Sequence, residues 1–91
     1  MTAQEFIDYL IAEARYDDVT QAMKKLGFSV DFVAKNVLAN AGDVTVSHVA
    51  MLWQGMPNKH DRKRTRDLFE LLAGVGLATP KGDGETWTVK L

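Results

Sequence analysis

The sequence predicts a mainly α-helical α+β fold with a small β-hairpin at its C-terminal end. Three observations lead to this prediction. Apolar residues recur at intervals of three and four in five segments, as on the buried face of a helix. Glycines follow most of these segments, where helices commonly end. The last residues, 85–91, instead alternate between apolar and polar side chains, as in a strand with one buried face.

The first helix is expected at about residues 3–15. Thr2 and Glu5 have the spacing of a capping box, in which each side chain binds a free backbone amide of the other residue. Apolar residues then follow at helical intervals, while Asp8 and Glu13 fall on the solvent side.

Two further helices are expected in the first half of the chain. Asp17 or Asp18 caps the second helix, and Gly27 ends it. Ser29 caps the third helix, whose apolar stripe runs up to Gly42, where the helix stops.

The second half begins with a short strand and a fourth helix. Residues 43–46 are short or β-branched, enough for one brief strand. Thr45 or Ser47 then caps a helix that ends before Gly55 and Pro57. Its apolar face comprises Val46, Val49, Ala50 and Trp53.

A fifth helix is expected at residues 61–74, capped by Asp61, and the hairpin follows it. At about 100° per residue, apolar side chains gather on one side of this helix and polar ones on the other. The apolar set is Leu68, Leu71, Leu72 and Val75, and the polar set is Arg62, Lys63, Arg66 and Glu70. The hairpin runs from residues 77–79 through a turn at 81–84, and its second strand directs Trp87, Val89 and Leu91 to one face.

The order helix, short strand, helix, turn, helix and hairpin resembles the winged helix-turn-helix family. Residues 64–72 (RTRDLFELL) resemble the family's recognition helix, and Gly76-Leu77 matches the Gly-Leu that commonly leads into the wing. Residues 81–85, followed by Trp87, look like a wing tip and its return strand. The resemblance covers residues 29–91. It implies a single domain, residues 1–91, in which an N-terminal helical extension at 1–28 precedes the winged helix-turn-helix.

Two features depart from the family pattern. The loop from Gln54 to His60 is longer than the tight turn of minimal helix-turn-helix units. Thr65 also stands where many members place a small apolar residue that anchors the recognition helix.

Charge is distributed unevenly along the chain, although the net charge is only −1. Residues 1–43 carry seven acidic and four basic side chains, whereas residues 44–91 carry five acidic and seven basic ones. Five of the eleven basic residues lie between Lys59 and Arg66. Such a local concentration of positive charge favours an anionic partner.

The resemblance implies that the helix at 61–74 enters the major groove of double-stranded DNA, with the wing at 79–89 against the neighbouring backbone. A helix fits this groove, and an arginine can donate two hydrogen bonds to one guanine edge. The expected DNA-binding residues are Lys59, Arg62, Lys63, Arg64, Arg66 and Lys81. On this interpretation the protein is a small DNA-binding transcriptional regulator or an accessory factor in replication or recombination.

Alternatives to this interpretation stay open. The basic residues also fit a solvated helix surface with Lys63–Asp67 and Arg66–Glu70 ion pairs one turn apart. A winged helix can equally serve as a protein–protein interaction module without DNA binding.

A homodimer through the N-terminal helices is a further expectation. Four or five phosphate contacts per chain give weak, salt-sensitive binding, which a second copy would strengthen. The candidate surface comprises Phe6, Tyr9, Leu10 and Tyr16, whose alternative role is to complete the core.

Other classes of chemistry find no support in the sequence. The absence of cysteine excludes disulfides, thiolate zinc sites and cysteine nucleophiles. His48 and His60 lack metal-ligand spacing, and no glycine-rich phosphate loop follows a strand. We therefore expect no cofactor, no metal and no enzymatic activity. With no signal peptide and no long apolar run, we expect a cytoplasmic protein without a membrane partner.

Overall fold

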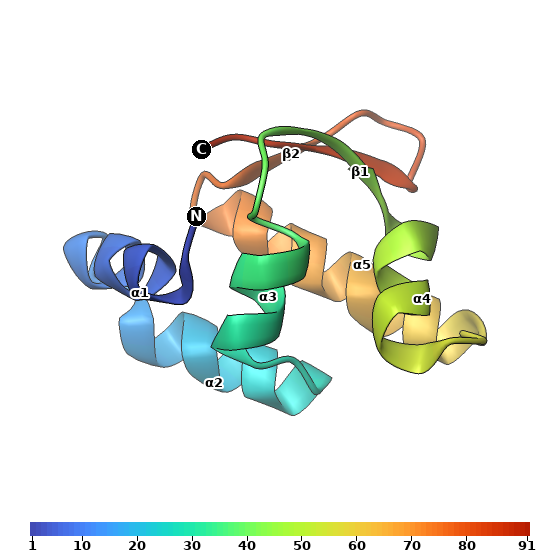
Figure 1. Cartoon of the computed structure of the whole chain (residues 1–91), viewed down its shortest axis with the longest axis horizontal. Helices are drawn as coiled ribbons and strands as arrows, with labels where there is room; N and C mark the ends of the chain where they lie inside the picture. Colours follow the sequence, from blue (N-terminus) through green and yellow to red (C-terminus); the bar gives the residue numbers. More distant parts are fainter.

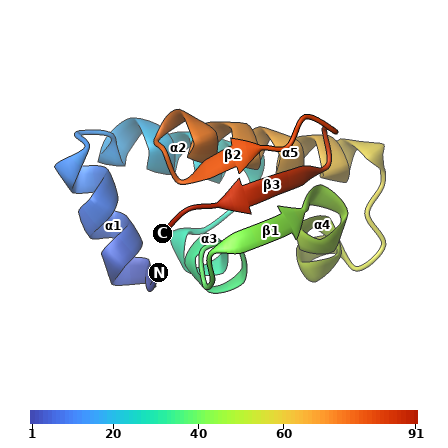
Figure 2. The same ribbon diagram turned by 90° about the horizontal axis from the view of Figure 1, so that it is seen from above.

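A computed structural model describes all 91 residues and has an α+β fold of five helices and a three-stranded antiparallel sheet (Figure 1). This architecture confirms the predicted class, a mainly α-helical α+β fold with a small β element. In chain order the elements are α1 (Ala3–Ala12), α2 (Tyr16–Leu26), α3 (Val30–Asn36), β1 (Gly42–Thr45), α4 (Val46–Gln54), α5 (Lys59–Gly74), β2 (Ala78–Pro80) and β3 (Thr86–Val89). The sheet lies over one side of the helical layer (Figures 1 and 2).

The sheet has the strand order β1-β3-β2, so the predicted two-stranded hairpin gains a third strand. Val44 of β1 lies opposite Trp87 of β3, and Thr79 of β2 lies opposite Thr88. The brief strand therefore pairs with the hairpin, which satisfies backbone groups that an isolated strand would leave free. The prediction that Leu91 shares the buried face is wrong, because β3 ends at Val89 and Leu91 is exposed.

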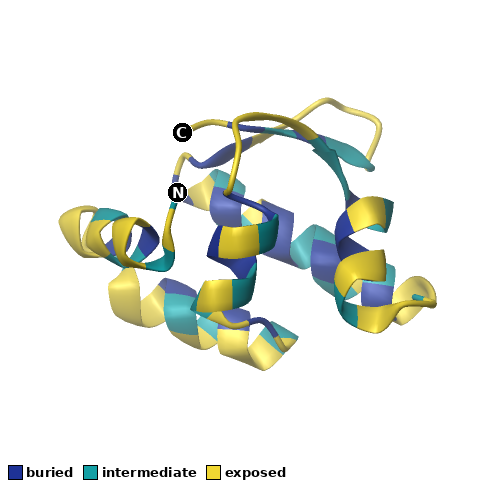
Figure 3. Ribbon diagram, viewed as in Figure 1, coloured by how far each residue is buried: buried dark blue, intermediate teal, exposed yellow.

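One hydrophobic cluster of 19 buried residues draws on every helix and on the sheet (Figure 3). Phe6 and Leu10 of α1 are fully buried in it, so they complete the core and are not available to a partner. Tyr9 is half-buried, and its hydroxyl donates a hydrogen bond to the carbonyl of Val75 beyond the end of α5. The largest fully buried side chains are Phe6, Phe69, Leu10, Met23, Leu38, Leu68 and Leu72.

The end of α1 and the start of α2 differ from the sequence predictions. Helix α1 ends at Ala12, because the chain turns at Ala14, which has a φ of 56°. Helix α2 begins at Tyr16, so Asp17 and Asp18 lie in its first turn and do not cap it. Gly27 ends α2 as predicted, with a φ of 92°.

Helix α3 is shorter than its apolar stripe. Ser29 caps it as predicted, accepting a hydrogen bond from the amide of Phe32, but the helix ends at Asn36 and not at Gly42. Val37 and Leu38 are still buried after the helix has ended. The apolar spacing therefore continues past the last turn of α3. For this reason the helix predicted from the sequence is longer than the helix in the structure.

The start of α5 is also earlier than predicted. Asn58 and not Asp61 is the N-cap, and its side chain accepts a hydrogen bond from the amide of Asp61 at 2.9 Å. The Asp61 carboxylate accepts one from the amide of Asn58 at 3.1 Å in return. This reciprocal pair is a capping box, which adds Lys59 and His60 to the helix. At the start of α4, Thr45 is the cap, one of the two predicted candidates.

Helices α4 and α5 are joined by the side chains of Trp53 and Thr65. Thr65 is fully buried. Its hydroxyl donates to the carbonyl of Asp61 at 2.8 Å and accepts the indole N–H of Trp53 at 3.0 Å. A polar residue is thus tolerated at this core position because its hydroxyl has partners on two helices.

The longest helix, α5, has 16 residues and a charged face. None of the five helices combines the length and the apolar character that a bilayer crossing requires.

Replacing Thr65 by valine is expected to lower the free energy of unfolding by about 1–2 kcal/mol, although valine has a similar shape. The substitution leaves the Trp53 indole N–H without a partner in a partly buried position. Urea denaturation measures the effect. Thr79→Val, at an exposed position on β2, is the matched control and should change stability by less than about 0.5 kcal/mol. Equal stability of the two variants would show that the Trp53–Thr65 bond does not contribute.

Candidate nucleic-acid interface

The N-terminal half of α5 presents one face of basic side chains. Their positions follow the spacing of three and four that places residues on one side of a helix. Together with His60 they line an open hollow that contains no hydrophobic side chain. This basic hollow comprises Lys59, His60, Arg62, Lys63 and Arg66.

Each arginine of the basic hollow is anchored to a backbone carbonyl. Arg62 donates from a terminal nitrogen to the carbonyl of Pro57 at 3.0 Å. Arg66 donates through Nε to the carbonyl of Gly84 at 3.1 Å, which ties α5 to the turn between β2 and β3. Hydrogen bonds of this kind orient the guanidinium groups, while other N–H groups of each arginine make no bond within the protein.

One of the two ion pairs expected along α5 is formed. Lys63 Nζ lies 3.0 Å from Asp67 Oδ2, both well exposed, so the pair contributes only a few tenths of a kcal/mol. Arg66 forms no ion pair with Glu70, because its guanidinium is directed to Gly84.

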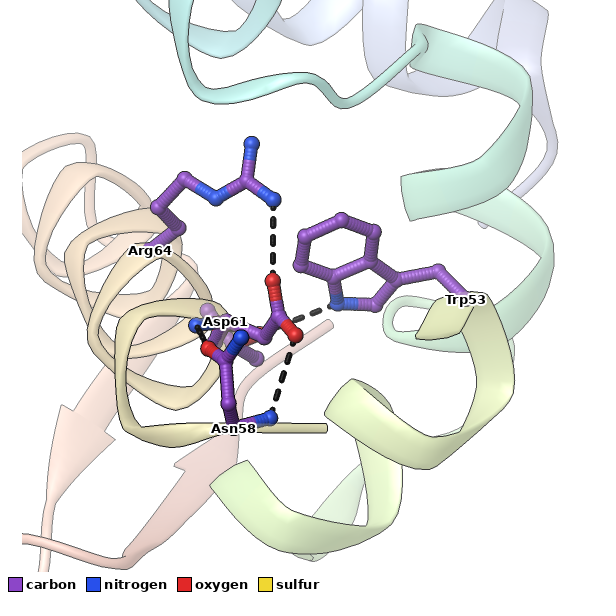
Figure 4. Close-up of polar contacts among 5 residues, drawn as sticks. Trp53, Asn58, Asp61 and Arg64 are labelled. Atoms are coloured by element: carbon purple, nitrogen blue, oxygen red, sulfur yellow. Dashed lines mark hydrogen bonds and ion pairs between the residues drawn. The ribbon is translucent and has the colours of Figure 1, made fainter. Parts of the chain in front are cut away.

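Arg64 points away from the basic hollow and is not among the residues that line it. Its terminal nitrogen lies 3.0 Å from Asp61 Oδ1, and its guanidinium carbon lies 4.6 Å from the centre of the Trp53 ring (Figure 4). This combination of an ion pair and a cation–π contact holds Arg64 against α4. The side chain supports the junction of the two helices.

Lys81 is also engaged within the protein. Its Nζ lies 3.0 Å from Asp43 Oδ2 on β1, and the Thr88 hydroxyl donates to the other oxygen of the same carboxylate at 2.8 Å. Hydrogen bonds from Lys81 and then Thr88 lower the pKa of Asp43. Lys81 therefore spans the outer side of the sheet from the β2–β3 turn to β1.

Two acidic side chains near the basic hollow, Asp61 and Glu85, make bonds within the protein. The Asp61 carboxylate is nearly buried, and its pKa is lowered by the backbone amide of Asn58 and then by the side chain of Arg64. Glu85, near the β2–β3 turn, accepts the amide of Ser47 at 2.9 Å at the start of α4. These contacts reduce the repulsion that the two carboxylates would exert on an anionic ligand.

Asp83 organises the β2–β3 turn. Its carboxylate accepts the amide of Thr86 at 2.7 Å, the amide of Glu85 at 2.9 Å and the hydroxyl of Thr86 at 2.8 Å. These donors, the amide of Thr86 first, lower the pKa of Asp83 to about 2. The turn bonded to Arg66 is therefore held by an ionised carboxylate.

Comparison with known protein families, with curated proteins and with solved structures found no match.

The structure thus brings together four of the six basic residues that the sequence predicts: Lys59, Arg62, Lys63 and Arg66. The other two form ion pairs outside the basic hollow, Arg64 with Asp61 and Lys81 with Asp43. Sequence reasoning missed three exposed apolar residues near the basic hollow, Met51, Leu52 and Met56. Met51 and Leu52 fall on the side of α4 opposite its buried residues, so the helical spacing contained this signal.

Replacing Asp83 by asparagine should remove part of the acid sensitivity of the protein. An aspartate in an unfolded chain has a pKa near ~3.9. Because the folded pKa is lower, at about 2, the contribution of Asp83 to stability is complete above the unfolded value and is lost as the pH falls toward 2. Urea denaturation between pH 7 and pH 2 should therefore show a steeper acid loss for the unmodified chain than for Asp83→Asn. Parallel pH profiles would contradict this role.

Proposed function

We propose that the protein binds double-stranded DNA as a winged helix-turn-helix, with the N-terminal half of α5 in the major groove. One observation carries the proposal: Lys59, Arg62, Lys63 and Arg66 lie on one face of α5 and line one open hollow, and Arg66 ties that face to the β2–β3 turn. A basic helix beside a protruding turn fits a groove and the backbone next to it.

The order of elements from α3 to β3 supports the winged helix-turn-helix assignment. It runs helix, strand, helix, helix, strand, strand, and the first strand joins the last two in one sheet. In this proposal α5 is the recognition helix and the β2–β3 turn is the wing. Helices α1 and α2 form the N-terminal extension, residues 1–28.

The arginines of the basic hollow are suited to both specific and nonspecific contacts. Arg66 uses only Nε for its bond to Gly84, so its two terminal nitrogens are free to fork onto a guanine edge or a phosphate. Because this bond restrains the side chain before DNA arrives, less conformational freedom is lost on binding. Arg62 keeps part of its guanidinium free in the same way.

The proposed role is to occupy a DNA site, as a transcriptional regulator or as an accessory factor in replication or recombination. The revised set of DNA-contacting residues is Lys59, Arg62, Lys63 and Arg66. Arg64 acts indirectly in this proposal, by fixing the start of α5 through Asp61 and Trp53.

A second candidate function is favoured by a specific observation. The exposed side chains of Met51, Leu52 and Met56 form an apolar surface at the end of α4, which suits the docking of a protein. In that case the chain is an interaction module, and duplex DNA does not bind at low salt.

The double variant Arg62→Ala/Arg66→Ala is expected to weaken binding to duplex DNA by roughly tenfold or more, because it removes two phosphate or base contacts. Fluorescence anisotropy at about 50 and about 200 mM salt measures the affinity. The slope of the logarithm of the binding constant against the logarithm of the salt concentration should decrease in magnitude by about 2.

The control is Lys24→Ala/Lys25→Ala, which removes the same charge from the exposed end of α2. It should bind nearly as well as the unmodified chain, and the helical circular-dichroism signal should be intact in both variants. Equal losses of DNA affinity in the two double variants would indicate a general charge effect. No binding of duplex DNA by the unmodified chain at low salt would favour protein docking.

A further inference from the structure

The corner between α1 and α2 and the loop after α4 lie toward opposite ends of the molecule's longest axis, which measures 34 Å (Figures 1 and 2). Each of these parts of the chain has exposed apolar residues. One group lies at the corner between α1 and α2, where Ile11 is 59% exposed and Tyr16 is 39% exposed. The other lies at the end of α4 and in the loop to α5, where Met56 is 93% exposed, beside Met51 and Leu52. Small proteins rarely leave several large apolar side chains in contact with water without a partner for them.

The two ends differ in shape. The corner between α1 and α2 is hollowed, and this corner hollow is lined by Ile11, Ala14, Arg15, Tyr16, Asp17 and Asp18. The loop after α4 instead projects from the surface, with Met56 almost entirely in solvent. Methionine is flexible and polarisable, so it adapts well to a partly aromatic pocket.

The two ends also carry opposite charge. In the corner hollow Arg15 pairs with Asp18 at 2.7 Å, which leaves Asp17 without an ion pair and the hollow with a net negative charge. The exposed Glu13 lies close to it in the chain and also forms no ion pair. Met56 is followed three residues later by Lys59, which likewise forms no ion pair. An acidic hollow and a projecting apolar side chain with a basic neighbour are complementary in both shape and charge.

We propose that the chain associates head to tail with further copies of itself, the Met56 loop of one copy entering the corner hollow of the next. Ile11 and Tyr16 then cover the methionine, and Lys59 approaches Asp17. Both halves of the contact occur in one sequence, so a second copy supplies the partner without any other protein.

This arrangement differs from a closed dimer. Because the loop and the hollow lie at opposite ends of the molecule, a head-to-tail pair leaves one loop and one hollow free. Further copies then extend the chain or close it into a ring, and the extent of association rises with protein concentration. The arrangement retains Tyr16 from the surface that the sequence predicts for a dimer through the N-terminal helices, whereas Phe6 and Leu10 of that surface lie in the core.

The association is measured by sedimentation velocity over a range of protein concentrations, in the absence of DNA. The unmodified chain should exceed the mass of a dimer at high concentration and dissociate as salt rises. Ile11→Gln and Met56→Gln should each weaken the association roughly tenfold. Leu91→Gln removes another exposed apolar side chain, one that belongs neither to the corner hollow nor to the loop after α4, and should have no effect. All three positions are exposed, so the thermal unfolding midpoint should change little.

A mixture of the two variants provides the sharpest test. Ile11→Gln keeps a native loop and Met56→Gln keeps a native hollow, so an equimolar mixture should form one-to-one pairs and stop at two chains. A monomeric mixture, a closed dimer of the unmodified chain, or a chain that is monomeric at every concentration would overturn the proposal. None of these outcomes depends on DNA binding by α5.

Discussion

The start of α5 is fixed by Asp61, and the placement of the other groups on this helix depends on it. Its carboxylate accepts the amide of Asn58 and pairs with Arg64, while its carbonyl accepts the hydroxyl of Thr65. Thr65 in turn accepts the indole N–H of Trp53 on α4 (Figure 4). These bonds set the rotation of α5 about its axis. The rotation directs Leu68, Phe69 and Leu72 into the core. It places Lys59, Arg62, Lys63 and Arg66 along the basic hollow, with the two lysines exposed and the two arginines half-buried.

The existence and type of the five helices were predictable from the chain, because glycine stops and apolar spacing act locally. Their ends were less predictable. Val37 and Leu38 extend the apolar stripe of α3 beyond the helix, since core packing can continue after a helix has ended. At α5, Asn58 and Asp61 are both good N-caps, and only the reciprocal hydrogen bonds between them decide which residue precedes the helix.

The candidate site was predictable to the extent that it lies on one helix. Helical spacing of three and four places four basic residues on one face: Lys59, Arg62, Lys63 and Arg66. The same helical geometry places Arg64 about 200° around the axis from Arg62, and therefore off this face. Lys81 could not be placed in this way. Its partner Asp43 is distant in the sequence and comes close only because β1 joins the sheet beside β3. Contacts of that kind depend on tertiary pairing, which local patterns do not specify.

The placement of DNA on α5 is tested most directly by NMR, with ¹⁵N-labelled protein titrated with random-sequence duplex DNA at low salt. The amide signals of residues 59–66 and of the β2–β3 turn, 82–85, should shift progressively, while those of α1 and α2 stay in place. Shifts confined to α1 and α2, or none at residues 59–66 as DNA is added, would contradict the assignment of α5 as the DNA-binding helix.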